Sequence, residues 1–403
     1  MKLADIIETF ISGDWGEETV AEDTSNSVFC IRGADIVPIT NHCFNGIPQR
    51  FVCDKTIENK TLKTGDLIIE KSGGSPTQST GRIVYVSEDL IKAKGNVVCS
   101  NFCTAFRVKT GWNPLYVYYY WQNVYNHGAF FNFEGKTSGI KNLQLDNALS
   151  AIDIEYLPLY KQNQIVASLA SIDEKIKVNR LINDNLEAMA KQLYDYWFVQ
   201  FDFPNEEGKP YKSSGGAMVY NEKLKREIPQ GWDVVNYMSL FGIGNGQTIP
   251  QTNGKIPAYG GNGVVKMIAE ANYSPCVIIG RVGANCGSIH YSKVPCWVSD
   301  NAIAVCPLNI NWLPFVYYSL SLYDLSKNKG GSSQPLITHA TLKNLFFPFS
   351  NATIDKYANI ANAIHQMIHK RQNETVTLTK QRDELLPLLM NGQASVNYHL
   401  SDD

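Results

Sequence analysis

The stretch IVASLASIDEKIKVNRLINDNLEAMAKQLYDYW, residues 165–197, decides the fold, because its seam positions recur in steps of four and three residues. That spacing places them on one face of an α-helix and is typical of a coiled coil. The same spacing returns 192 residues later. The two predicted seams consist of Ile165, Leu169, Ile172, Ile176, Asn179, Asn183, Leu186, Ala190, Leu193 and Trp197, and of Tyr357, Ala361, Ile364, Ile368, Arg371, Thr375, Leu378, Arg382, Leu385 and Leu389.

Each seam is apolar at its ends and polar near its middle, at Asn179 with Asn183 and at Arg371 with Thr375. If the helices pair antiparallel, the two centres meet and their polar groups fix the register. A parallel pair would also align them, but the intervening domain makes an antiparallel return easier to connect. A helix of about forty residues is roughly 60 Å long. That length exceeds one turn of DNA, about 35 Å.

The segments before the two helices also repeat in the same order. Residues 65–73, GDLIIEKSG, correspond to residues 275–283, PCVIIGRVG, and each predicts a buried strand followed by a basic residue and a glycine turn. Residues 111–119, GWNPLYVYY, correspond to residues 311–318, NWLPFVYY, and predict helices with proline in the first turn. A single heptad run would favour an ordinary helical hairpin. The duplication instead favours two globular heads on two long helices.

The predicted fold class is α+β, with two mixed α/β domains joined by two long helices as an antiparallel coiled coil with an internal pseudo-twofold repeat. The expected boundaries are 1–158 for the first domain, 159–203 for the first helix, 204–349 for a linker and the second domain, and 350–403 for the second helix and tail. Acidic residues interrupt the first ten positions, and no segment is apolar enough to span a membrane. A cytoplasmic location is expected. The nine cysteines lack a CxxC pair and are expected to be buried thiols.

The net charge of -2 is not that of a typical DNA-binding protein, but its distribution is uneven. Residues 60–141 carry ten basic and five acidic side chains, and residues 240–345 carry seven basic and three acidic ones. Each half therefore contains a mildly basic region.

Two segments approach enzyme motifs without completing them. The segment Asn113-Pro114-Leu115-Tyr116 approaches the Asn-Pro-Pro-Tyr loop of adenine methyltransferases, but its repeat counterpart keeps only the proline, which indicates helix-start packing. Glycine-rich residues 242–246 continue into a Gln-Thr-Ile-Pro segment and not into a helix. His365 and His369 share a helix face without further ligands, so a solvated face is expected there and no metal or cofactor is predicted. The aromatic cluster at residues 116–121 is expected in the core.

Several phrases resemble the specificity subunits of type I restriction-modification systems, over essentially the whole chain. They are YLPL at 156–159 leading into QIV at 164–166 and IDEKI at 172–176, YWFVQFDFP at 196–204, IPQGW at 228–232, YGGNG at 259–263, and LLPLLMNG at 385–392. The resemblance implies a non-catalytic subunit that reads a split target in double-stranded DNA. It also implies binding to two methyltransferase subunits, joined by restriction translocase subunits.

Two alternatives remain open. One is the recognition part of a self-sufficient restriction-methylation enzyme, and the other is a coiled-coil scaffold with incidental heads. For DNA contact, amides and guanidinium groups suit base edges, whereas lysine, serine and backbone amides suit phosphates. Lys71 with Arg281 and Ser138 with Gln334 rank highest because the repeat pairs them. The full candidate set is Lys71, Ser72, Gln78, Ser79, Arg82, Lys136, Thr137, Ser138 and Lys141 in the first half, and Asn245, Gln247, Tyr259, Asn262, Arg281, Asn285, Lys327, Lys329, Ser332, Ser333 and Gln334 in the second.

Overall fold

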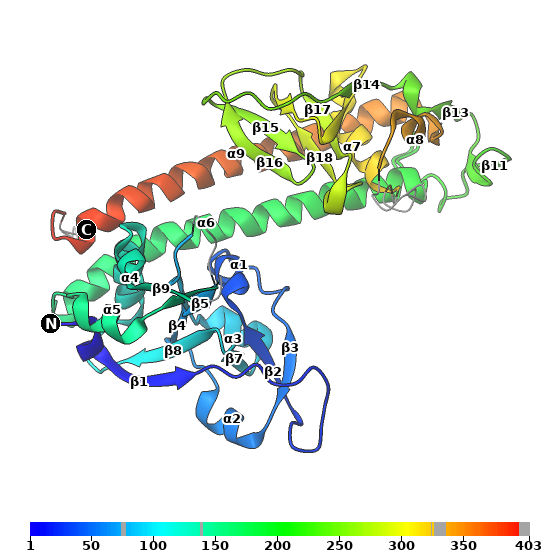
Figure 1. The fold of residues 1–403 in the computed structure, drawn as a ribbon. Coiled ribbons are helices and arrows are strands. Elements are labelled where there is room, and N and C mark those ends of the chain that lie inside the picture. Colours follow the sequence, from blue (N-terminus) through cyan, green and yellow to red (C-terminus); the bar gives the residue numbers. More distant parts are fainter. Residues whose placement is uncertain (74–77, 138–139, 324, 326–335, 395–403) are drawn as a thin grey trace, which may run out of the picture. The chain divides into compact units, whose positions relative to one another are not determined.

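The computed structural model of the chain describes residues 1–73, 78–137, 140–323, 325 and 336–394 (Figure 1). Its contacts divide into two units, each with one globular head and part of both long helices. Unit 1 is Met1–Arg180 with Glu374–Asp403, and unit 2 is Leu181–Asn373. Head 1 denotes the part of unit 1 before the first long helix, and head 2 the globular part of unit 2.

The core of head 1 is an antiparallel four-stranded sheet in the order β1-β8-β4-β6. All four residues of its central strand β4 are buried, because both faces of the sheet are covered. Leu67 and Ile69 pack on one face in the cluster that contains Trp121 of α4, and Ile68 packs on the other. The elements are β1 (Ile7–Ser12), β4 (Leu67–Glu70), β6 (Ile83–Tyr85), β8 (Cys103–Val108) and α4 (Pro114–Asn126).

Two smaller sheets complete head 1, in the orders β3-β2-β7, where β2 and β7 are parallel, and β5-β10-β9. The glycine turn that the sequence predicts after β4 is Gly73, whose φ of 142° suits glycine. The remaining elements are β2 (Asn26–Ile31), β3 (Gln49–Val52), β5 (Ser72–Gly73), β7 (Val97–Cys99), β9 (Glu134–Thr137), β10 (Ile140–Leu143), α1 (Ile36–Thr40), α2 (Asp54–Lys60), α3 (Glu88–Lys94) and α5 (Leu145–Ala151).

Among the described residues, head 2 repeats two of these three sheets. Its four-stranded sheet has the order β14-β20-β17-β18, and its three-stranded sheet β16-β15-β19 again contains one parallel pair, β15 with β19. The elements are β13 (Asp233–Asn236), β14 (Phe241–Asn245), β15 (Ile256–Gly260), β16 (Gly263–Ile268), β17 (Cys276–Gly280), β18 (Ile289–Ser292), β19 (Trp297–Val298), β20 (Ala302–Pro307), β21 (Phe346–Phe349), α7 (Leu313–Ser321) and α8 (His339–Lys343).

The strand register confirms the repeat that the sequence predicts. Glu70 of β4 pairs with Cys103 of β8, and its counterpart Gly280 of β17 pairs with Ala302 of β20. Both predicted helix starts are also confirmed, since α4 and α7 each carry proline in the first turn. The side-chain oxygen of Asn113 caps α4 by accepting a hydrogen bond from the Leu115 amide at 2.8 Å. Asn113 therefore has a helix-capping role, as the repeat indicated.

The long helices are α6 (Leu159–Tyr194) and α9 (Asn351–Met390). In unit 1 the start of α6 meets the end of α9, where Leu169 packs in one cluster with Leu389, and the Asp173 carboxylate pairs with Arg382 at 3.0 Å. In unit 2 the end of α6 meets the start of α9, where the Tyr357 hydroxyl donates to the Ala190 carbonyl at 3.2 Å. The two helices therefore pack antiparallel, and every residue of both predicted seams is buried or half-buried.

The link from α6 to head 2 is rich in aromatic side chains, with Phe203 stacked on Trp232 at 5.0 Å between ring centroids. It contains a π-helical turn at Asp195–Val199 and the hairpin of β11 (Met218–Asn221) and β12 (Arg226–Pro229). The short 3-10 helices are η1 (Leu3–Ile6), η2 (Gly33–Asp35), η3 (Ala129–Phe133), η5 (Tyr237–Ser239), η6 (Gly283–Asn285) and η7 (Ile310–Trp312).

Candidate DNA-binding surfaces

The end of β4 places the first candidates of head 1. The backbone amides of Lys71 and Ser72 both donate to the carbonyl of Phe102, at 2.9 and 3.1 Å. The Ser72 hydroxyl also bonds the Asn142 side chain at 2.5 Å. These backbone hydrogen bonds fix the position of the segment, and the side chains of Lys71 and Ser72 on it are half-buried.

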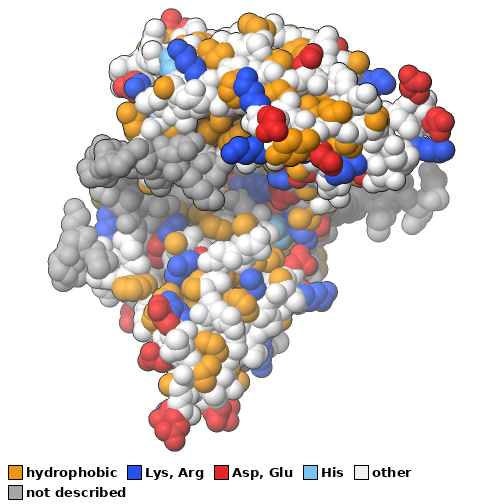
Figure 2. All heavy atoms as spheres, turned by 90° about the vertical axis from the view of Figure 1, so that its right-hand side faces the viewer, with side chains coloured by type: hydrophobic (Ala, Val, Ile, Leu, Met, Phe, Trp, Pro, Cys, Tyr) orange, Lys and Arg blue, Asp and Glu red, His pale blue; other side chains and the backbone are white. Residues whose placement is uncertain are grey.

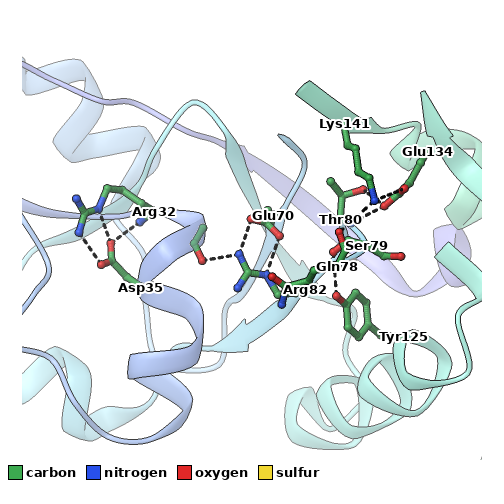
Figure 3. Close-up of polar contacts among 11 residues, drawn as sticks. Arg32, Asp35, Glu70, Gln78, Ser79, Thr80, Arg82, Tyr125, Glu134 and Lys141 are labelled. Atoms are coloured by element: carbon green, nitrogen blue, oxygen red, sulfur yellow. Dashed lines mark hydrogen bonds and ion pairs between the residues drawn. The ribbon is translucent and has the colours of Figure 1, made fainter. Parts of the chain in front are cut away.

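Arg82 on the neighbouring segment is engaged inside the head (Figure 3). Its guanidinium donates to both carboxylate oxygens of Glu70, at 2.8 and 2.6 Å, and to the carbonyl of Gly33 at 2.9 Å. The hydrogen bond to Glu70 raises the pKa of Arg82. Because Glu70 is only 2% exposed, Arg82 serves first as its counter-ion.

Lys141, Gln78 and Ser79 form a second polar group in Figure 3. The Lys141 ammonium lies 3.2 Å from Glu134 and donates to the Gln78 carbonyl, and the Ser79 carbonyl accepts from Tyr125. Burial opposes ionisation of Glu134, but hydrogen bonds from Thr80 and Lys141 lower its pKa overall. Lys141 is therefore held by a neighbouring carboxylate, whereas the Gln78 side chain is exposed.

In head 2 the ends of β15 and β17 approach each other beside η6. Asn262 and Asn285 are exposed there, and Arg281 is half-buried. The Arg281 amide donates to the carbonyl of Asn301 at 2.8 Å, as Lys71 does to Phe102 in head 1. Unlike Arg82, Arg281 has a buried guanidinium Nε with no hydrogen-bond partner among the described residues. Among the described residues, no carboxylate is paired with Arg281 as Glu70 is with Arg82.

The other candidates fall into three groups. Asn245, the last residue of β14, and Gln247 after it are exposed, while Tyr259 is half-buried in β15 with its hydroxyl 3.4 Å from the Tyr291 carbonyl. Lys136 and Thr137 lie in β9, whose side chains are not described at these positions. Outside the described residues lie Ser138, Lys327, Lys329, Ser332, Ser333 and Gln334.

The expectation of a solvated face at His365 is wrong. His365 is 1% exposed, and its two ring nitrogens bond the hydroxyls of Tyr291 and Tyr318. Burial, with charged Lys293 nearby, lowers its pKa to about 3. The helix face that carries His365 packs against head 2, and the sequence spacing alone gave no sign of those two tyrosines.

Sequence reasoning also missed Arg32, Trp15 and Phe102, which with Glu70 surround a cleft in head 1. Their positions depend on loops between strands, for which the sequence contains no repeating signal. The predicted core cluster was correct, since Tyr116 and Trp121 are buried. So are most cysteines, although Cys43 is exposed.

Three general properties of the described residues bear on function: the distribution of charge, the grouping of metal-ligand side chains and the apolar character of the helices. On the face drawn in Figure 2, lysine and arginine side chains are interspersed with aspartate and glutamate. Within the described residues, no three His, Cys, Asp or Glu side chains are grouped as a metal site requires. No helix in the same part of the chain has the length and apolar character to cross a membrane.

The chain resembles known proteins over most of its length. The family model described as "Type I restriction modification DNA specificity domain" matches residues 53–188 and 229–384, which together exceed half of the chain. The MjaIX specificity subunit of Methanocaldococcus jannaschii is 24% identical, over 95% of this chain and 92% of that protein. The EcoprrI specificity subunit of Escherichia coli is 27% identical over 28% of this chain and 30% of its own length.

Among solved structures, the S subunit of a type I restriction-modification system from M. genitalium superimposes with a TM-score of 0.56, at 17% identity, covering 96% of this chain and 95% of that one. It shares the fold described above. Together with the duplicated heads and the family match, this places the chain in the type I restriction-modification DNA specificity family, whose role is DNA target recognition.

Proposed function

We propose that this chain is a non-catalytic subunit in which each head reads one half of a split DNA target. The observation that carries the proposal is the shared frame of the two heads, in which strand order, register and the backbone contact after β4 and β17 are all repeated. Two similar reading heads on rigid helices suit two separated half-sites. Lys71 and Arg281 occupy equivalent positions in this frame, and both are candidates for DNA contact.

The proposed partners are two methyltransferase subunits and restriction translocase subunits. Membership of the specificity family supports them, and so do large apolar side chains left exposed on the long helices. On α6 these include Val178, Leu181 and Met189, and on α9 Ile360, Met367 and Val376. We propose these helix surfaces as docking sites for methyltransferase subunits.

The test compares the methylation pattern of DNA in cells with and without this chain. A methylated split motif that is present only with the chain is the expected result. In parallel, the purified chain alone is incubated with DNA and a labelled methyl donor, and no incorporation is expected. Incorporation by the isolated chain would instead support the self-sufficient enzyme, and an unchanged pattern in cells would contradict target recognition.

A further inference from the structure

Head 1 contains a cleft of about 570 Å³ between its four-stranded sheet and the sheet β3-β2-β7. This volume lies in the usual range of small-ligand sites. Residues from four separate loops and strand ends line it. The lining side chains with aromatic, charged or polar groups include Trp15, Arg32, Glu70, Ser100, Asn101 and Phe102.

The walls of the cleft are held together by backbone hydrogen bonds. The Ser100 amide donates to the carbonyl of Ile31 at the end of β2, at 2.8 Å. Two residues later, the Phe102 carbonyl accepts from Lys71 and Ser72 after β4. The turn from Ser100 to Phe102 therefore ties both sheets together, and the cleft is formed before any ligand arrives.

The charged groups of the cleft are already paired. Arg32 forms two hydrogen bonds with the buried carboxylate of Asp35, at 2.9 and 2.8 Å, which raise the pKa of Arg32. Glu70 is paired with Arg82, as Figure 3 shows. Among the lining residues that the structure describes, a phosphate would therefore meet no unpaired positive charge, which favours a neutral ligand.

Its remaining groups suit a flat ring with hydrogen-bonding edges. Trp15 and Phe102 provide aromatic faces. Phe102 is 58% exposed, and one face of the Trp15 ring is covered by the Arg50 guanidinium, 3.9 Å from the ring centroid. The Ser100 hydroxyl is buried, and in the described part of the chain it has no oxygen or nitrogen partner. It neighbours the Cys103 thiol, a weak hydrogen-bonding group whose pKa burial raises to about 11, so the hydroxyl can still bond a ligand.

Head 2 has the same frame but not the same cleft wall. The register of the strands makes Gly280 the counterpart of Glu70, and Asn301 that of Phe102. There, a Cβ atom added at Gly280 would lie 2.4 Å from the Asn285 carbonyl and 2.9 Å from that of Gly261. Backbone thus fills the position that the Glu70 side chain occupies in head 1.

We propose that the cleft of head 1 binds one nucleobase unstacked from the target duplex, held between Trp15 and Phe102. This inference rests on the proposed function, because it takes the ligand from the DNA that head 1 reads. Bases inside a duplex present only their edges in the grooves, whereas a cleft with aromatic walls accepts a protruding ring. Stacking on the two aromatic rings would replace stacking on the adjacent bases, and the Ser100 hydroxyl would replace a hydrogen bond to the partner base.

The test uses the full chain with its methyltransferase partner and duplexes that carry the target identified by methylation. One base at a time is changed on one strand only, so that each pair in the half-site of head 1 becomes a mismatch in turn. At one position the mismatch should tighten binding about tenfold, because unpairing is then less costly. Bases read within an intact duplex respond oppositely, since mismatches there weaken binding.

A pair of variants locates the effect. Phe102→Ala should weaken binding to the matched duplex by about fivefold to a hundredfold, the usual value of stacking on one ring. Phe131→Ala is the control, because Phe131 is 65% exposed in the same head but outside the cleft. Equal effects of the two variants, or no mismatch that tightens binding, would overturn the cleft proposal while leaving target recognition intact. If the wild-type chain binds all DNA sequences equally, the proposed function is overturned as well.

Discussion

Arg82 and Arg281 carry the same chemical group in opposite settings. The first donates to the buried carboxylate of Glu70, and the second has an Nε without a partner among the described residues. The sequence predicted DNA contact for both, because an amino-acid sequence alone does not show which basic side chain will pair with a buried carboxylate. The structure separates them, and it makes different predictions for each.

Replacing Arg82 should destabilise unit 1. Arg82→Ala leaves the Glu70 carboxylate buried without its counter-ion, which typically costs about 3–5 kcal/mol. Denaturant unfolding measures this loss. Lys92→Ala, which removes an exposed helix ion pair with Glu88, should change stability by less than about 0.5 kcal/mol. Combining Arg82→Ala with Glu70→Gln should recover part of the loss, and failure to do so would refute the counter-ion role.

Replacing Arg281 should alter specificity and not stability. If Arg281 reads a base, Arg281→Ala relaxes one position of the target and costs about 1–3 kcal/mol there. Dissociation constants for a panel of single-base-pair variants of the target give this value. The exposed Lys255 of the same unit provides a matched control as Lys255→Ala. Equal weakening on every sequence would assign Arg281 to a phosphate.

His365 should make unit 2 sensitive to acid. Its pKa is about 3 in the folded chain, against about 6.5 when unfolded. Between these values the unfolded state binds more protons, so stability is complete above pH 6.5 and falls as the pH decreases toward 3. At pH 5 the expected loss is about 2 kcal/mol relative to pH 7. His365→Gln should remove this part of the pH dependence in unfolding experiments, whereas the exposed His369→Gln should keep it.

At the scale of elements, the long helices were the most predictable part. Apolar side chains in steps of three and four specify a helix face by local geometry, and α6 spans Leu159–Tyr194 within the expected segment 159–203. The polar centre was expected to join Asn179 to polar residues of the other seam, but the printed bond of its amide is to Glu374, at 3.1 Å. Glu374 is not a seam residue, because long side chains beside the seam can reach the polar groups within it.

The strand ends were far less predictable than the strands. Buried runs such as Leu67 to Ile69 can be predicted from their apolar composition, and the internal repeat shows which strand of head 2 corresponds to each strand of head 1. The cleft of head 1 depends instead on contacts between residues distant in sequence, such as Ser100 with Ile31. No periodic pattern encodes those contacts, so Trp15, Arg32 and Phe102 did not emerge as candidates.

The helix pair of unit 1 can be tested by removing one side chain from its interior. Leu169 is fully buried against the end of α9, so Leu169→Ala should cost about 2–5 kcal/mol in unfolding free energy. Val178 lies exposed on the same helix, and Val178→Ala should cost less than about 0.5 kcal/mol. Similar costs for both variants would contradict the assigned seam.

At the scale of the whole molecule, the two heads should act independently on the target. Lys71→Ala in head 1 and Arg281→Ala in head 2 should each relax only one half of the methylated motif. The double variant should relax both halves, with effects that add, because the residues belong to different units. Sequencing of methylated sites in cells provides the measurement. Relaxation of both halves by either single variant would show that the heads do not read separately.

The close backbone contact at Gly280 limits how the two heads can diverge. Any side chain there would collide with carbonyl groups of Asn285 and Gly261, so a single codon change cannot give head 2 an acidic wall like that of head 1. Substitutions that change the DNA sequence preference of head 2 are easier to accommodate at exposed positions such as Asn262 and Asn285. Although both heads descend from one repeated plan, their mutational routes to a new target are therefore different.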